Sequence, residues 1–227
     1  MIVSFYGTYD EDESAIPITG NGKTLSMVGF GYLDYQKNKE IWSNFYTDFS
    51  SEVIGFQEMI NRIKDSILDN NKPNPNLVLL VTEMRKLLDA VGSTIEQILF
   101  VDDFAEQIRK LECALYWDTQ RFMSINKRLR IHTNVQLIPY KTHMDNSPCY
   151  LPKCMKEHKI WVYSHKPQLE KARICFNSWK VGKHYNTKEF CFDKLIVPKK
   201  SKILQNTFNK IGSPAGSTIE KQEEGIF

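Results

Sequence analysis

The apolar residues of this chain follow two alternating patterns. Short, nearly continuous apolar runs are typical of strands buried in a sheet. Between them, apolar residues recur at every third or fourth position, as in amphipathic helices. The runs predict strands at residues 2–6, 41–46, 77–81, 114–117, 135–140, 159–164 and 172–179. The helical spacing predicts helices at residues 24–37, 54–68, 94–111 and 124–130.

Strands that alternate with helices over residues 1–140 predict an α/β core with a mainly parallel central sheet flanked by helices. The remainder is richer in strands, which predicts an antiparallel β extension on the C-terminal side, at one edge of the same sheet. From about Lys199 onward apolar residues become scarce. We therefore expect one domain over 1–198, with its core at 1–140 and its extension at 141–198. A basic segment and flexible C-terminal tail would follow at 199–227.

Composition narrows the class of protein without identifying it. The 227 residues are 41% hydrophobic and 25% charged, which excludes a disordered or collagen-like chain. Lys and Arg number 30 against 27 Asp and Glu, so any site for a polyanion must come from local clustering of charge. Five cysteines at irregular spacings favour a reducing, cytosolic setting. No apolar run approaches the ~18 residues that a membrane span needs.

Residues 20–24 read Gly-Asn-Gly-Lys-Thr and directly precede a predicted helix. In a P-loop (Walker A motif), backbone N–H groups point at phosphates, the lysine reaches the β- and γ-phosphates and the threonine hydroxyl binds Mg²⁺. The full pattern G-x-x-x-x-G-K-[ST] requires a glycine where this chain has Pro17. A plain helix N-terminus with a nearby lysine is the alternative interpretation. The nucleotide-binding interpretation assigns the site to Thr19, Gly20, Asn21, Gly22, Lys23, Thr24 and Leu25.

A second predicted strand, 77–81, ends next to Thr82 and Glu83. The carboxyl ends of parallel strands face a common crevice, so Glu83 is expected near Lys23. P-loop ATPases use an acidic residue there to activate water. Thr82 stands where many such enzymes have an aspartate, and its hydroxyl could hold a water bound to Mg²⁺. A core strand followed by a surface glutamate is the alternative.

The predicted strand at 114–117 is followed by Asp-Thr-Gln and then by a basic stretch. A polar side chain at this place would lie beside a γ-phosphate, and Gln120 is our candidate for that sensor. The stretch has four cations in ten residues, which could stabilise phosphoryl charge in a neighbouring subunit or contact a nucleic-acid backbone. A solvated basic helix is the alternative. The four are Arg121, Lys127, Arg128 and Arg130.

The order of these segments resembles the FtsK/HerA superfamily of DNA-translocating P-loop ATPases. Within it, the sequence looks most like zonular occludens toxin-like ATPases and the genome-packaging ATPases of phages and archaeal viruses. The similarity covers residues 2–140, with a weaker echo at 185–189. It is carried by Gly-Lys-Thr-Leu-Ser at 22–26, the segment 39–44, the strand before Glu83, and Thr-Gln-Arg at 119–121 followed by Lys-Arg-Leu-Arg at 127–130.

The resemblance implies hydrolysis of ATP with Mg²⁺ by a homo-oligomeric ring that translocates or packages double-stranded viral DNA. It implies phosphate binding by Lys23, Mg²⁺ binding through Thr24 and Thr82, water activation by Glu83 and γ-phosphate sensing by Gln120. Either Arg128 or Arg130 would be the arginine finger supplied to a neighbouring subunit. Candidate DNA contacts are Arg121, Lys127, Lys199 and Lys200.

The same resemblance implies a capsid or portal-type viral protein as a partner. It also implies a location in the cytoplasm, which would be that of the host cell for a viral protein, or in the virion. A zonular occludens toxin-like ATPase for filamentous particle assembly or secretion is one alternative, although such proteins usually carry a transmembrane segment. A catalytically silent P-loop protein that only binds nucleotide or a partner is another. The departures at Pro17 and Thr82 bear on hydrolysis more than on binding.

A cluster of cysteine and histidine residues follows the predicted core. Cys149, Cys154 and His158, with His165 or Cys175 further along, could supply four soft ligands for zinc. Structural zinc sites usually have a tighter second pair, and both residue types are also common as buried packing residues. The sequence leaves this choice open.

Overall fold

The computed structural model describes residues 1–8, 22–68, 76–87, 95–149, 154–164 and 174–185. The chain divides into two compact units, Met1–Val197 and Pro198–Phe227. The second unit lies wholly outside the described residues, so the domain boundary expected at residue 198 stays a prediction. Within the described residues, no helix combines the length and apolar character needed to cross a membrane.

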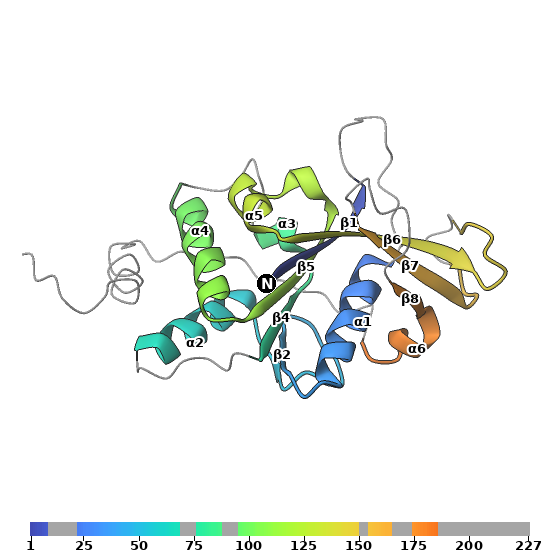
Figure 1. Ribbon diagram of the computed structural model, residues 1–227, viewed down its shortest axis with the longest axis horizontal. Coiled ribbons are helices and arrows are strands. Elements are labelled where there is room, and N and C mark those ends of the chain that lie inside the picture. The colour runs from blue at the N-terminus through green and yellow to red at the C-terminus, as the bar shows by residue number, and fades with distance from the viewer. Residues whose placement is uncertain (9–21, 69–75, 88–94, 150–153, 165–173, 186–227) are drawn as a thin grey trace, which may run out of the picture. The chain divides into compact units, whose positions relative to one another are not determined.

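The strands in the described part of the chain form one mixed sheet in the order β3-β2-β4-β5-β1-β6-β7-β8 (Figure 1). All pairs from β3 to β6 are parallel, and β6-β7 and β7-β8 are antiparallel. The predicted parallel core and antiparallel extension are therefore confirmed. The strands are β1 (Ile2–Thr8), β2 (Glu40–Ser43), β3 (Glu52–Val53), β4 (Leu77–Val81), β5 (Ala114–Arg121), β6 (Val135–His143), β7 (His158–Ser164) and β8 (Ile174–Asn177).

Helices cover the two faces of this sheet, with α1 and α6 on one side and α4 and α5 on the other (Figure 1). The helix α1 follows β1 in the chain and lies against β1, β4 and β5. The alternation of strands and helices thus builds a layered α/β fold. The helices are α1 (Lys23–Tyr35), α2 (Phe56–Leu68), α3 (Met84–Leu87), α4 (Ile95–Lys110), α5 (Lys127–His132) and α6 (Ser178–Gly182), with a 3₁₀ turn η1 (Phe122–Ser124).

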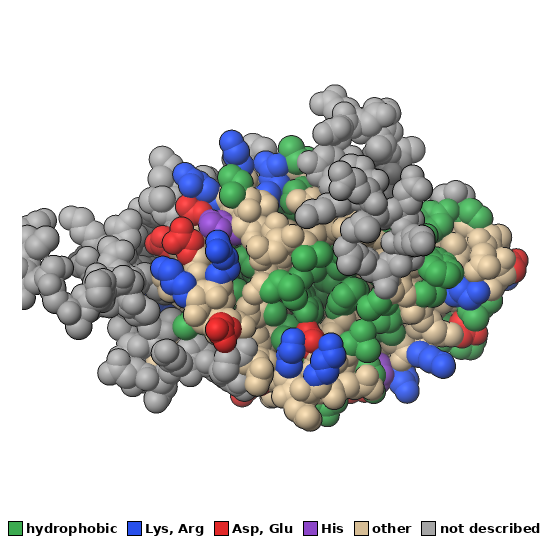
Figure 2. All heavy atoms as spheres, viewed as in Figure 1, with side chains coloured by type: hydrophobic (Ala, Val, Ile, Leu, Met, Phe, Trp, Pro, Cys, Tyr) green, Lys and Arg blue, Asp and Glu red, His purple; other side chains and the backbone are tan. Residues whose placement is uncertain are grey.

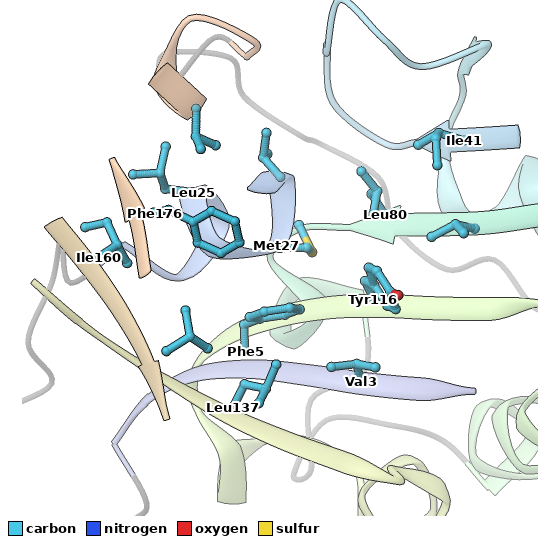
Figure 3. Close-up of a cluster of buried hydrophobic side chains, with 14 of the residues drawn as sticks. Val3, Phe5, Leu25, Met27, Ile41, Leu80, Tyr116, Leu137, Ile160 and Phe176 are labelled. Carbon is cyan, nitrogen blue, oxygen red and sulfur yellow. The ribbon is translucent and has the colours of Figure 1, made fainter. Parts of the chain in front are cut away.

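One hydrophobic core joins the parallel strands to the antiparallel extension. Figure 3 shows Phe5 of β1, Leu25 and Met27 of α1, and Ile160 and Phe176 of β7 and β8 in the same cluster. Phe30 links these parts directly, because its ring lies 5.4 Å from that of Phe5 and 5.6 Å from that of Phe176. The extension is therefore packed into the core and holds α1 against the sheet.

The element boundaries differ from the sequence expectations mainly at strand ends. The strand β5 ends at Arg121 rather than at residue 117, so it carries the polar residues that the sequence placed after it. The strand β2 ends at Ser43, and the two-residue β3 was not expected. The basic helix begins at Lys127 because the Asn126 side chain accepts the backbone N–H of Arg128 and caps it.

Candidate active site

The helix α1 begins at Lys23, and Gly22 is its N-cap residue. Gly22 has a φ of 92°, and a Cβ built on it would lie 3.0 Å from Cδ1 of Ile160 on β7. Only glycine fits this combination of left-handed backbone and close neighbour. The expected site residues Thr19, Gly20 and Asn21, like Pro17, lie outside the described residues.

The Lys23 side chain points into the molecule rather than into solvent. Lys23 is only 7% exposed, and its Nζ donates a hydrogen bond of 2.8 Å to Oε1 of Gln120 at the end of β5. Burial lowers the pKa of Lys23, while the negative charges of Asp118 and Glu83 oppose that shift. The structure therefore brings together the lysine, the expected sensor glutamine and the expected catalytic glutamate.

The carboxylate at the centre of this arrangement belongs to Asp118 of β5. Its side chain accepts hydrogen bonds from the Thr24 hydroxyl at 2.5 Å, from the Thr82 hydroxyl at 3.0 Å and from the Glu83 backbone N–H at 2.7 Å. Burial raises the pKa of Asp118, and these hydrogen bonds together with Lys23 offset the shift only in part. A cation beside the carboxylate would therefore stabilise its ionised form.

The turn after β4 is held in an unusual backbone conformation. Glu83 has a φ of 57°, a left-handed geometry that is uncommon for a residue with a side chain and is often found at functional sites. Asn44 fixes this turn, since its side-chain oxygen accepts the Thr82 backbone N–H at 2.9 Å and its amide donates to the Thr82 carbonyl at 3.3 Å. The geometry directs the Glu83 N–H at Asp118.

Sequence reasoning missed Asp118 and Asn44 as site residues. Asn44 directly follows β2, and Asp118 lies on β5 beside the carboxyl end of β4, so position near strand ends is the signal that could have identified them. The sequence prediction names only Gln120 of the Asp-Thr-Gln segment, although a strand that ends at Trp117 places Asp118 directly at its carboxyl end. In the structure the Thr82 hydroxyl donates a hydrogen bond to the carboxylate of Asp118 on the neighbouring strand β5.

The basic residues after β5 are placed around η1 and α5. Arg128 forms an ion pair of 3.1 Å with Asp102 of α4, and its side chain is 53% exposed. Arg130 donates to the carbonyl oxygen of Ile125 at 3.0 Å. Figure 2 shows Lys and Arg atoms beside Asp, Glu and His atoms over α4 and α5, so this surface is mixed in charge.

The remaining DNA-contact candidates are more scattered. Lys127 is exposed at the start of α5, and Arg121 is half-buried at the end of β5. Lys199 and Lys200 lie outside the described residues, as do residues 186–189 of the weaker echo. Tyr185 is described, and burial together with the Asp118 charge raises its pKa.

The cysteine and histidine residues lie together where the chain leaves β6 and enters β7. Cys149, Cys154 and His158 lie together as the sequence suggested, and the fourth member is His143. Cys175 is exposed on β8 and is not part of this cluster. The other suggested fourth ligand, His165, lies outside the described residues.

Comparison with solved structures finds proteins of similar fold. The N-terminal domain of zonular occludens toxin from Neisseria meningitidis is 15% identical at a TM-score of 0.48, and the match covers 82% of this chain and 98% of that one. The genome-packaging NTPase B204 from Sulfolobus turreted icosahedral virus 2, in complex with ATPγS, is 12% identical at a TM-score of 0.43, over 73% and 97% of the two chains. A KaiC-like protein, PH0186, from Pyrococcus horikoshii is 10% identical at 0.43, over 78% and 84%.

Both groups named by the sequence resemblance are therefore among the structures to which this chain is similar. No family model matches the sequence, and no curated protein matches it. With TM-scores below 0.5, these similarities transfer no residue role, substrate or partner to this chain.

Proposed function

We propose that this protein binds ATP with Mg²⁺ at the N-terminus of α1 and hydrolyses it. The observation that supports this most directly is the contact of the Thr24 hydroxyl with the Asp118 carboxylate at 2.5 Å, beside the buried Lys23. A hydroxyl and a carboxylate are hard oxygen ligands, the kind that Mg²⁺ prefers. The carboxylate of Asp118 is buried, and its hydrogen bonds and Lys23 compensate for that burial only in part, so a bound Mg²⁺ ion would stabilise it.

In this proposal each residue has a separate task. Lys23 exchanges its hydrogen bond with Gln120 for contacts with phosphate oxygens. Gln120 can then contact the γ-phosphate. Thr24 and Asp118 would hold Mg²⁺, and the ion would supply positive charge against the charge that develops on the phosphate oxygens. Thr82 and the Glu83 backbone keep Asp118 oriented by hydrogen bonds. The Glu83 side chain accepts a proton from the attacking water.

The test is ATP turnover by the full chain with purified variants. Lys23→Ala and Asp118→Asn are expected to lose turnover and Mg²⁺-dependent binding of a fluorescent ATP analogue. Glu83→Gln is expected to lose turnover while it keeps binding, because the amide cannot accept the proton. Lys180→Ala, an exposed lysine on α6, is the matched control and should behave as wild type.

Two outcomes would contradict hydrolysis at this site. Turnover that survives Lys23→Ala would place the reaction elsewhere. Mg²⁺-dependent binding without any turnover in the wild type would favour the catalytically silent alternative.

We further propose that hydrolysis drives movement of double-stranded DNA through a ring of subunits. The resemblance of the sequence supports this, and Arg121 at the end of β5 and the exposed Lys127 at the start of α5 supply cations for such a contact. Arg128 is the better candidate for the arginine finger, because its side chain is 53% exposed whereas Arg130 is half-buried. Arg128 would exchange its ion pair with Asp102 for contact with the neighbouring subunit.

Mixing of variants tests the finger across a subunit interface. Arg128→Ala alone should lose at least tenfold in turnover, whereas Arg62→Ala on α2 should not. A mixture of Lys23→Ala and Arg128→Ala subunits should regain part of the activity, since one variant keeps the finger and the other keeps the phosphate site. A chain that sediments as a monomer with nucleotide and DNA present would contradict the ring.

A further inference from the structure

Four potential metal ligands meet at the end of the β6–β7 hairpin. His143 is the last residue of β6 and His158 the first of β7, and the two are paired across the strands. Cys149 and Cys154 come from the segment between the strands. One ligand atom from each of the four residues lies within 4.8 Å of the others.

The contacts within this cluster are poor unless something binds between the side chains. Nδ1 of His143 is buried and has no hydrogen-bond partner among the residues that the structure describes. His158 Nε2 lies 3.2 Å from Sγ of Cys149, a weak hydrogen-bond partner for an imidazole that is only 4% exposed. Both cysteines are free thiols. Burial of a polar group without a strong partner costs free energy, so the cluster is expected to have a ligand.

We propose that His143, Cys149, Cys154 and His158 bind one zinc ion in a tetrahedral structural site. Two thiolates and two neutral imidazoles form a complete Cys₂His₂ ligand set. In a tetrahedral zinc site the ligand atoms lie about 3.3–3.8 Å apart, as follows from bond lengths of ~2.0–2.3 Å. The observed spread of at most 4.8 Å requires only a small inward movement.

The ligand types select the metal. Thiolate sulfur is a soft ligand, which suits zinc and disfavours Mg²⁺ and Ca²⁺. Because four protein ligands leave no open position, the ion has no place for a reacting water. The site is therefore structural, and it is separate from the Mg²⁺ site proposed at Asp118.

A zinc ion here would fasten the hairpin that supports α1. The hairpin places Ile160 of β7 beside Gly22, where its Cδ1 would lie 3.0 Å from an added Cβ. Ile160 and Val162 of β7 belong to the central core cluster. Since metal binding to such a site contributes to folding free energy, zinc would stabilise the extension and, through it, the N-terminus of α1.

The experiment measures metal content of the full chain, expressed with added zinc and purified with reductant and without chelator. We expect about one zinc per chain by mass spectrometry of the elements. Cys149→Ser and Cys154→Ser should each lose most of it, because serine is a poor zinc ligand. Cys175→Ser, which removes an exposed thiol outside the cluster, is the matched control and should keep zinc. Lys23→Ala should also keep it, which separates this proposal from the proposed ATPase function.

Titration of the metal-free wild-type chain with cobalt gives a second readout that needs no variant. We expect the visible absorption of tetrahedral cobalt with a thiolate charge-transfer band, both removed by equimolar zinc and unaffected by excess Mg²⁺. If the cysteine variants do not fold, this titration decides alone. The proposal is overturned if the wild type retains well under one zinc and gives no such spectrum, or if zinc remains in Cys149→Ser.

Discussion

At the scale of single residues, Asp118 connects every part of the candidate site. It is buried, and it receives hydrogen bonds from α1, from the end of β4 and from the turn that follows. Its pKa is raised because burial outweighs those contacts. A carboxylate placed in this way is poorly stabilised until a cation binds. In the absence of that cation, ionised Asp118 is therefore expected to lower the free energy of unfolding.

This raised pKa predicts a pH dependence. A carboxyl group with a raised folded pKa contributes stability that is present below its unfolded pKa, about 3.9, and is lost as the pH rises through the folded value. Relative to Asp118→Asn, the wild type should therefore lose stability as the pH rises above about 4. Urea unfolding without Mg²⁺ or nucleotide measures the difference, with Asp65→Asn on α2 as control. A difference that does not change with pH would contradict the raised pKa.

A second residue-scale prediction concerns the buried pair of Tyr116 and Asp34. The Tyr116 hydroxyl donates to Oδ2 of Asp34 at 2.6 Å, and Lys39 lies 2.8 Å from the other carboxylate oxygen. Burial and Asp34 together raise the pKa of Tyr116. Tyr116→Phe removes the hydrogen bond and leaves the carboxylate half-satisfied, which should cost about 1–3 kcal/mol in the free energy of unfolding. Tyr35→Phe, on the exposed side of α1, should change it little.

At the scale of elements, the close approach of α1 to the sheet governs its sequence. A Cβ added at Gly31 would lie 2.7 Å from Cδ1 of Leu80, a fully buried residue of β4. Glycine lowers helix propensity, yet here it allows the helix to lie against the strand. The sequence pattern alone presents this glycine as a weakness in the helix.

Gly31→Ala is therefore expected to destabilise the protein by about 1–3 kcal/mol despite its higher helix propensity, because Leu80 has no room to move. Gly182→Ala on α6 is the matched control, since its Cβ would lie 3.9 Å from Leu25, an ordinary contact. Thermal unfolding of both variants measures the effect, and only Gly31→Ala should unfold at a clearly lower temperature than the wild type. A stabilising effect of Gly31→Ala would show that α1 can shift away from β4.

At the scale of the whole molecule, the antiparallel extension completes the core of the parallel part. Phe176 of β8 packs on Phe30 of α1, and Ile160 and Val162 of β7 are buried in the same cluster as Phe5. The extension is thus expected to be required for folding.

A chain that ends at His143 should therefore fail to fold cooperatively, because its α1 would expose the apolar face that β7 and β8 cover. A chain that ends at Val197 should keep the unfolding transition of the full protein, which also tests the predicted domain boundary. Circular dichroism during heating measures both. Cooperative unfolding of the shorter chain would mean that residues 1–143 form an independent core.

The parallel α/β core, the antiparallel extension and the position of Lys23 close to residues at strand ends could all be predicted from the sequence. These depend on local patterns, namely buried apolar runs and the position of glycine and lysine before a helix. The sequence prediction also grouped Cys149, Cys154 and His158 as candidate zinc ligands, because they are close together in the sequence.

Two features required the folded structure: which strand carries the carboxylate beside Thr24, and which residue is the fourth member of the cysteine and histidine cluster. Asp118 contacts Thr24 and Thr82, which are distant from it in the sequence. His143 lies at the end of β6, and the apolar pattern of the sequence does not indicate that end. Strand ends are set by pairing with neighbours, which lengthened β5 to Arg121 and β6 to His143. The physical reason is that register across a sheet is a property of packed strands and is absent from any one of them.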